Sequence, residues 1–292
     1  MIEQNFIDFK QKRDLGAMLS DTFQFLNAEW KPFFGSILKI SIIPILIAIC
    51  AMVYSTMTSV SFLGDFYQVI DYDIVNLNFS DLILPISIAV ISYLTALASI
   101  TIAALSYIKS YTAHKGFVNY QEIQNLTKEK FWPYVGLFII VGIIVFFGML
   151  FCILPGIYFG VVLSLSFCLV IFQNKGVFDA ISDSFGFIKE HWWETFGILI
   201  VVQLLIAVAS FLVDLPASFY QTVDIGSILK DQDMTALSSA FADPIYLSLI
   251  AFSYFVKFIL YIVSIVVSVF IYYDIKEQKN PSSDSINEIG VE

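Results

Sequence analysis

Few residues in this chain have side chains that commonly carry out catalysis or bind metals. There are two histidines, His114 and His191, and three cysteines, Cys50, Cys152 and Cys168. The cysteines lie far apart in apolar runs, so we interpret them as small core residues. The chain has no HExxH or CxxC pattern, no GxSxG motif and no phosphate-binding loop. We therefore expect no metal, no cofactor and no catalytic residues.

Two lysines lie inside otherwise apolar stretches, and a charge within a membrane is a candidate functional site because it is costly to bury there. Lys39 lies nine residues after Trp30, and we expect its ammonium group to reach the membrane surface. Lys257 lies near the middle of a long apolar run, 245–273. It either reaches the outer surface from a shorter span, or it is buried and needs an acceptor such as Gln203 or a lipid phosphate.

Nine aspartates lie in two polar segments between apolar stretches, which raises the question of a divalent-cation site. They are Asp65, Asp71, Asp73 and Asp81 in the first segment and Asp214, Asp224, Asp231, Asp233 and Asp243 in the second. Their spacing matches no calcium loop, so we interpret them as solvated loop surface.

One six-residue phrase occurs twice, as SDTFQF at 20–25 and SDSFGF at 182–187. The flanking residues align without a gap, and seven of twenty positions in 19–38 and 181–200 are identical. Such a phrase is either a catalytic motif or a structural unit that is used twice. The repeat motif comprises Ser20, Asp21 and Phe23 in the first copy and Ser182, Asp183 and Phe185 in the second.

Both copies lie in segments with the spacing of an amphipathic helix. Within 14–31 and 177–193, apolar residues recur at steps of three and four, and the Ser-Asp pairs fall largely on the opposite side. The apolar positions are Leu15, Met18, Leu19, Phe23, Leu26 and Trp30 in the first segment and Val177, Ile181, Phe185, Ile188 and Trp192 in the second. We therefore expect two helices in the membrane interface, with both aspartates facing the cytoplasm.

The composition is that of a membrane protein. Hydrophobic residues make up 58% of the chain and charged residues 14%, with a mean hydropathy of +0.82, whereas soluble domains are roughly 45–50% apolar and about 25% charged. A helix needs roughly 20 apolar residues to cross a bilayer. Six stretches qualify: about 33–54, 82–108, 131–153, 155–173, 195–213 and 245–273. The net charge of −10 excludes nucleic acid as a natural partner.

The basic residues predict the orientation of the chain. Twelve lysines and arginines lie in the N-terminal segment, in 109–130, in 174–194 and in the C-terminal tail, whereas the alternate segments hold only Lys230. Cytoplasmic loops carry such an excess of positive charge, so both termini are expected in the cytoplasm.

The third and fourth spans form one uncharged run that is interrupted by ILPGIYF at 153–159, where Pro155 and Gly156 predict a tight hairpin turn. A weaker copy of the repeated segment precedes the third span, and 113–130 has a poorer helical period. The expected fold is all-α, with six transmembrane helices as three hairpins, each preceded by a cytoplasmic interfacial helix. One membrane domain, 1–273, would contain units of about 14–108, 113–173 and 177–273, followed by a disordered tail at 274–292.

All four tryptophans lie at the expected cytoplasmic ends of the first, third and fifth spans. They are Trp30, Trp132, Trp192 and Trp193. Indole rings favour the headgroup region of a bilayer, so we interpret the four residues as interface anchors.

One stretch, 154–200, carries a recognisable pattern in Pro155, Gly156, Tyr158, Gly176, Ala180, Ser184, Phe185, Trp192 and Phe196. It resembles the signature region of a bacterial superfamily of six-helix membrane proteins of unknown function, related to the membrane domain of some glycerophosphodiester phosphodiesterases. The resemblance implies a six-span fold in the bacterial cytoplasmic (inner) membrane. No phosphodiesterase domain follows the last span in the printed sequence, so we do not expect that activity.

The sequence favours a non-enzymatic integral membrane protein that organises lipids or envelope protein partners. The alternative is a transporter or channel for a small or lipidic solute, because transporters often contain internal repeats. The predicted spans contain no acidic residue away from their ends. Lys257, Lys39 and Gln203 therefore form the candidate intramembrane polar site.

Overall fold

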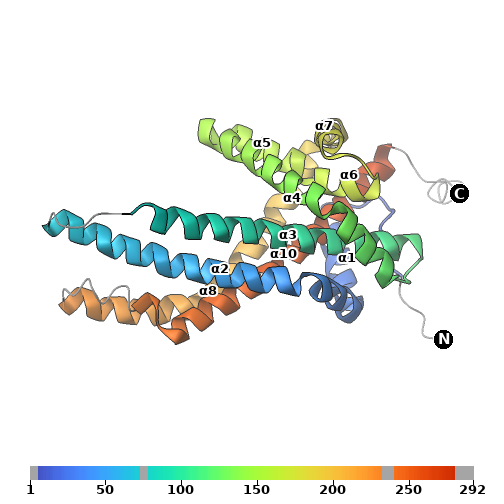
Figure 1. The fold of residues 1–292 in the computed structure, drawn as a ribbon. Helices are drawn as coiled ribbons and strands as arrows, with labels where there is room; N and C mark the ends of the chain where they lie inside the picture. The colour runs from blue at the N-terminus through green and yellow to red at the C-terminus, as the bar shows by residue number, and fades with distance from the viewer. Residues whose placement is uncertain (1–5, 73–77, 232–239, 280–292) are drawn as a thin grey trace, which may run out of the picture. The chain divides into compact units, whose positions relative to one another are not determined.

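The computed structural model describes residues 6–72, 78–231 and 240–279, and the side chains of 6–62, 78–222 and 240–279. Every regular element within these residues is a helix (Figure 1). In chain order the helices are α1 (Leu15–Ala28), α2 (Trp30–Tyr72), α3 (Ser80–Ala113), α4 (Tyr120–Phe151), α5 (Ile153–Ser164), α6 (Ser166–Phe172), α7 (Val177–Ile188), α8 (Trp192–Asp231) and α10 (Pro244–Lys279).

Within the described residues, six helical segments are long and apolar enough to cross a membrane, which confirms the predicted number. They are Trp30–Phe62, Ser80–Ala113, Tyr120–Phe151, Ile153–Phe172, Trp192–Thr222 and Pro244–Lys279. The protein is therefore a polytopic membrane protein. The membrane in which it lies, its orientation and the pairing of spans as three hairpins stay predictions.

Several helices extend beyond the predicted spans. The segments 54–81 and 214–244 were expected to be loops, but α2 continues to Tyr72 and α8 to Asp231. A hydropathy window detects only the apolar part of a helix, whereas the polar residues that follow can continue the same backbone hydrogen bonds. The aspartates Asp73 and Asp233 lie outside the described residues.

The predicted turn at Pro155 and Gly156 is wrong in position. The helix is interrupted at Cys152, whose backbone is extended. Both predicted turn residues lie in the first turns of α5. Proline is tolerated in the first turn of a helix because the amide that it lacks would have no partner there. A Cβ atom at Gly156 would lie 2.7 Å from the backbone nitrogen of Met149, so the glycine permits α4 and α5 to approach closely.

Two other expectations differ from the structure. The segment 113–130 forms no separate interfacial helix, because α4 begins at Tyr120 and continues through the third span. The predicted disordered tail begins too early, since α10 continues to Lys279; residues 280–292 lie outside the described residues.

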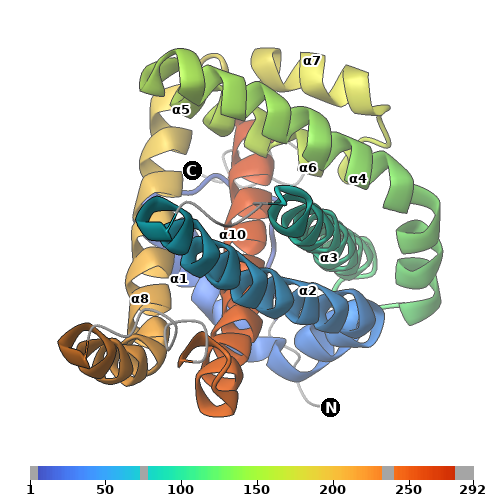
Figure 2. The same ribbon diagram turned by 60° about the vertical axis from the view of Figure 1, so that its left-hand side comes forward.

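The chain divides into two compact units. Unit 1 comprises Met1–Ser41, Ala98–Leu205 and Tyr261–Glu292, and unit 2 comprises Ile42–Leu97 and Ile206–Leu260. In unit 1, α4 and α5 lie side by side, and α7 packs beside α5 and α6 (Figures 1 and 2). The helices α1 and α7, the start of α4 and the end of α10 lie toward the same end of unit 1 (Figure 1). The candidate site lies among residues of unit 1.

Candidate functional site

The segment that precedes α1 lies in the core of unit 1. Phe9 is fully buried and stacks on Phe270 with ring centroids 4.4 Å apart. Its ring also meets the edge of Phe25 on α1 at 5.1 Å. The backbone N–H of Ile7 donates a hydrogen bond to the hydroxyl of Tyr111, at 3.1 Å. Burial of an aromatic side chain is strongly stabilising, so this segment is held in place before the first helix begins.

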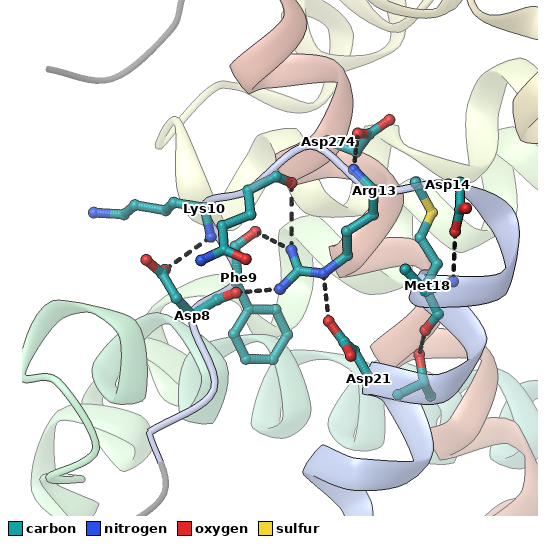
Figure 3. Close-up of polar contacts among 11 residues, drawn as sticks. Asp8, Phe9, Lys10, Arg13, Asp14, Met18, Asp21 and Asp274 are labelled. Carbon is teal, nitrogen blue, oxygen red and sulfur yellow. Dashed lines mark hydrogen bonds and ion pairs between the residues drawn. The ribbon is translucent and has the colours of Figure 1, made fainter. Parts of the chain in front are cut away.

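Arg13 fixes the end of this segment (Figure 3). Its Nε donates to Asp21 Oδ2 at 2.7 Å, and Nη1 donates to the carbonyl of Phe9 at 3.1 Å and more weakly to that of Gln11. Nη2 donates to the carbonyl of Asp8. The Arg13 side chain is only 4% exposed. Its planar donors are thus largely satisfied by one carboxylate and the chain that precedes it.

The main chain of Arg13 connects this segment to α10. Its backbone N–H donates to Asp274 Oδ1 at 2.8 Å (Figure 3). The second carboxylate oxygen of Asp274 accepts from Gln278 Nε2, also at 2.8 Å. Asp274 is 4% exposed, and no ion pair to its carboxylate occurs among the described residues. The described residues thus give this buried carboxylate two neutral donors and no cation in direct contact.

A cavity of about 500 Å³ lies beside this carboxylate. Its titratable wall is formed by Lys12, Arg13, Asp14, His191, Glu194 and Asp274. Its apolar wall is formed by Leu15, Met18, Ile198, Ile271 and Ile275. The volume lies within the range of small-molecule sites, roughly 300–1,000 Å³. This cavity, which we call the Asp274 cavity, is the candidate functional site.

Both copies of the repeat motif carry an ion pair with a basic residue eight positions before the aspartate. Asp21 pairs with Arg13, and Asp183 pairs with Lys175. The helices that contain the motif begin at equivalent positions, Leu15 and Val177. Extending the sequence alignment upstream by a few residues would have placed Arg13 opposite Lys175. Sequence reasoning missed both basic partners because the alignment began inside the helices.

The buried face of α1 differs from the predicted apolar face. The helix buries Met18, Thr22 and Phe25, whereas Leu15 and Phe23 are exposed. In α7 the buried residues are Ala180, Ser184 and Ile188. Small or hydroxyl-bearing residues permit close packing, and the hydroxyl of Thr22 bonds to the carbonyl of Met18 within its own helix. A periodicity of apolar residues cannot show which apolar side contacts protein and which stays uncovered.

The tryptophans fall into two groups. Trp30, Trp132 and Trp193 are exposed, at 56%, 75% and 76%. Trp192 instead stacks on Phe196, with ring centroids 5.0 Å apart. Its indole nitrogen is buried and has no hydrogen-bond partner among the residues that the structure describes.

Lys257, Lys39 and Gln203 each contact different residues. Lys257 in unit 2 pairs with Asp214 at 2.9 Å, and Ser253 also donates to that carboxylate. Asp214 therefore corrects the expectation that no acidic residue lies inside a span, because it lies within the candidate span Trp192–Thr222. In unit 1, Gln203 donates to Ser264 at 3.3 Å.

Lys39 lies elsewhere in unit 1. It is exposed, and its ammonium lies 5.7 Å from the ring centre of Tyr120.

At the start of α10 in unit 2, Asp243 accepts from the backbone N–H groups of Tyr246 and Ile245. The hydrogen bond from Tyr246 is the main cause that holds the pKa of Asp243 below its ordinary value.

The two histidines take part in local hydrogen bonds. Beside His114, the buried hydroxyl of Ser110 donates to Glu122 at 3.0 Å and lies 3.5 Å from the imidazole Nδ1. His191 Nδ1 lies 3.3 Å from Glu194. Within the part of the chain that the structure describes, no three His, Cys, Asp or Glu side chains are grouped as a metal site.

Comparisons with known proteins add no relative: no family model, curated protein or solved structure matches the chain. The class that the fold defines is thus a polytopic helical membrane protein with six candidate spans.

Proposed function

We propose that the protein is a non-enzymatic integral membrane protein that organises lipids at one membrane face. The observation that carries this proposal is a set of exposed aromatic side chains on unit 1. They are Phe23, Trp30, Phe117, Trp132, Phe178 and Trp193, each more than half exposed. Isolated exposed apolar residues are ordinary, but aromatic rings at the ends of spanning helices are typical of the lipid headgroup region.

The ion pairs of the repeat motif support the same interpretation. Asp21 and Asp183 are held by basic residues of the preceding segments, so the polar sides of α1 and α7 are fixed while Phe23 and Phe178 remain uncovered. A helix with one polar side and exposed aromatic rings can lie in the membrane interface. The basic residues at this end of unit 1 favour the cytoplasmic face of a bacterial inner membrane. Membership of the six-helix superfamily is part of this proposal.

Depth-dependent fluorescence quenching tests the proposal. Four variants, each retaining one of the four tryptophans with the others replaced by Phe, are reconstituted in vesicles whose lipids carry bromine near the headgroup or deep in the acyl chain. We expect Trp30, Trp132 and Trp193 to be quenched more strongly by the shallow bromines. Trp192 is the matched control, because its stacked ring should be quenched least. Equal quenching of all four, or stronger quenching by deep bromines, would contradict the proposal.

A second test asks whether the protein holds lipid at all. Native mass spectrometry of the protein extracted in mild detergent should show retained phospholipid, and co-purification would reveal envelope protein partners. Protein that carries neither lipid nor partner would leave the proposed function without support.

The Lys257–Asp214 ion pair is the observation that favours a transporter or channel instead, because paired charges within spans mark ion and solute pathways. Lys257 lines neither the Asp274 cavity nor the smaller cavity of about 130 Å³ beside Cys168. We retain lipid organisation as the proposed function because the exposed aromatic side chains of unit 1 support it directly. Solute uptake by proteoliposomes that is abolished in Lys257→Ala would favour the alternative.

A further inference from the structure

We propose that the Asp274 cavity binds a phosphoethanolamine group, with its primary ammonium at Asp274 and its phosphate at Lys12. The inference rests on the proposed lipid function and names the headgroup that the protein recognises. The charges on the cavity wall support it, and Figure 3 shows three of the residues that carry them, Arg13, Asp14 and Asp274.

The carboxylate of Asp274 lies on the cavity wall. Asp274 is almost fully buried, and among the described residues it accepts only from the backbone of Arg13 and the amide of Gln278. A carboxylate offers about four acceptor positions, so two remain for a ligand. The guanidinium of Arg13 does not serve Asp274, because its donors are directed at Asp21 and at backbone carbonyls. A ligand that brings its own positive charge would fit this place.

The positive charge that would fit beside Asp274 belongs to an organic cation. Within the part of the chain that the structure describes, the acidic residues around the cavity do not form a metal-binding group, which favours an organic cation. Quaternary ammonium groups are recognised by cages of aromatic rings. No Phe, Tyr or Trp is among the described residues that line this cavity. A primary ammonium, which donates hydrogen bonds to carboxylates, therefore fits better than a choline group.

The same wall also carries a positively charged side chain, that of Lys12. Lys12 lines the cavity, is exposed and forms no ion pair among the described residues. His191 lies on the wall as well, already beside Glu194 at 3.3 Å. A cavity with both an unpaired carboxylate and an unpaired ammonium is complementary to a zwitterion. Lysine binds phosphate as a point charge, so Lys12 is assigned to the phosphate.

The cavity also has an apolar wall. It includes Met18 and Ile271, which are buried, and Leu15, which is 41% exposed. An apolar surface that runs from the headgroup position to an exposed leucine suits the glycerol and acyl portion of a lipid. Phosphatidylethanolamine and free phosphoethanolamine share the same recognised group, and the two sources are separated by experiment.

The test is competitive lipid binding by the full chain in detergent, measured by native mass spectrometry. The probes are phosphatidylethanolamine, phosphatidylcholine and phosphatidylglycerol with identical acyl chains. We expect wild-type protein to prefer phosphatidylethanolamine. In Asp274→Asn, which keeps an acceptor for the Arg13 backbone, the preference over phosphatidylcholine should fall by roughly tenfold or more, since hydrogen bonds to charged groups are strong.

Two further variants make the result specific. Lys12→Ala changes an exposed side chain and should weaken phosphatidylethanolamine and phosphatidylcholine alike, because both carry the phosphate. Asp183→Asn is the matched control: it removes a carboxylate of the repeat motif that does not line the cavity, and should leave the preference for phosphatidylethanolamine unchanged. The Lys12 and Asp183 variants alter exposed positions, so they remain informative if Asp274→Asn fails to fold.

The outcomes separate the site from the proposed function. Equal retention of the three lipids by wild type, or an unchanged preference in Asp274→Asn, overturns the site but leaves general lipid organisation standing. Retention of no lipid, with no binding of free phosphoethanolamine, overturns both. Added phosphoethanolamine that binds wild-type protein without any phosphatidylethanolamine adduct supports the recognised group but assigns its source to the soluble compound.

Discussion

The two copies of the repeat motif share their sequence and differ in their surroundings. In the first, the Arg13 side chain is 4% exposed and Asp21 28%, and the same guanidinium also bonds to the carbonyls of the segment that precedes α1. In the second, Lys175 is 31% exposed and Asp183 46%. One ion pair therefore organises a buried segment and the wall of a cavity, whereas the other joins two surface side chains.

The difference shows that a repeated phrase specifies a local contact and not its energetic weight. A planar guanidinium presents five donors and holds several partners at once, whereas a lysine ammonium acts as a compact charge. The identity of the basic residue thus matches the environment of each copy. The largest expected effect is therefore in the first copy.

Replacing Arg13 by Ala should be the most damaging change. It leaves Asp21 without its partner and frees several carbonyls, and breaking a buried pair by removing one member costs about 3–5 kcal/mol; because Asp21 is partly exposed, we expect the lower end. The measurement is the free energy of unfolding in bicelles. A loss below about 1 kcal/mol would make the first copy energetically equal to the second.

The second-largest expected effect concerns Glu29, which follows the first copy of the motif, and its counterpart after the second copy. Glu29 is 6% exposed and accepts a hydrogen bond from Tyr107 at 2.7 Å, whereas its aligned counterpart His191 lies beside the exposed Glu194. Tyr107→Phe should destabilise the protein by about 1.5–3 kcal/mol, because the buried carboxylate loses a donor. The same unfolding measurement checks this value. The control Glu194→Ala removes the exposed member of the His191–Glu194 pair and should cost at most about 1 kcal/mol, and equal losses in the two variants would remove this part of the contrast.

Lys175→Ala should have a small effect that depends on salt. Exposed ion pairs contribute about 0–1 kcal/mol and are screened by ions. We expect the difference from wild type to shrink further at high ionic strength, while that of Arg13→Ala persists. Unfolding curves at low and high salt measure both. A salt-independent loss as large as that of Arg13→Ala would show that the two copies are equivalent in energy as well as in sequence.

The sequence predicted the features that depend on local pattern. The number of spans follows from runs of apolar residues, and the helices that contain the motif follow from steps of three and four. The turn that lies at Cys152 was predicted at Pro155 and Gly156 instead. The prediction was wrong because proline can begin a helix as well as end one, and because Gly156 allows two helices to pack closely. The Asp274 cavity could not be predicted, since Asp274 is 261 positions from Arg13 and only the folded chain brings them together.

The smallest effect should be the same in both copies. Thr22 and Ser184 are aligned and fully buried, and each hydroxyl donates to a carbonyl of its own helix at 2.7 Å. Those carbonyls keep their backbone partners when the hydroxyl is removed, so no buried group is left unsatisfied. Thr22→Val and Ser184→Ala should therefore each change the free energy of unfolding by less than about 1 kcal/mol. Unfolding in bicelles measures both, and a large loss in one variant alone would show that the two copies differ in packing as well as in charge.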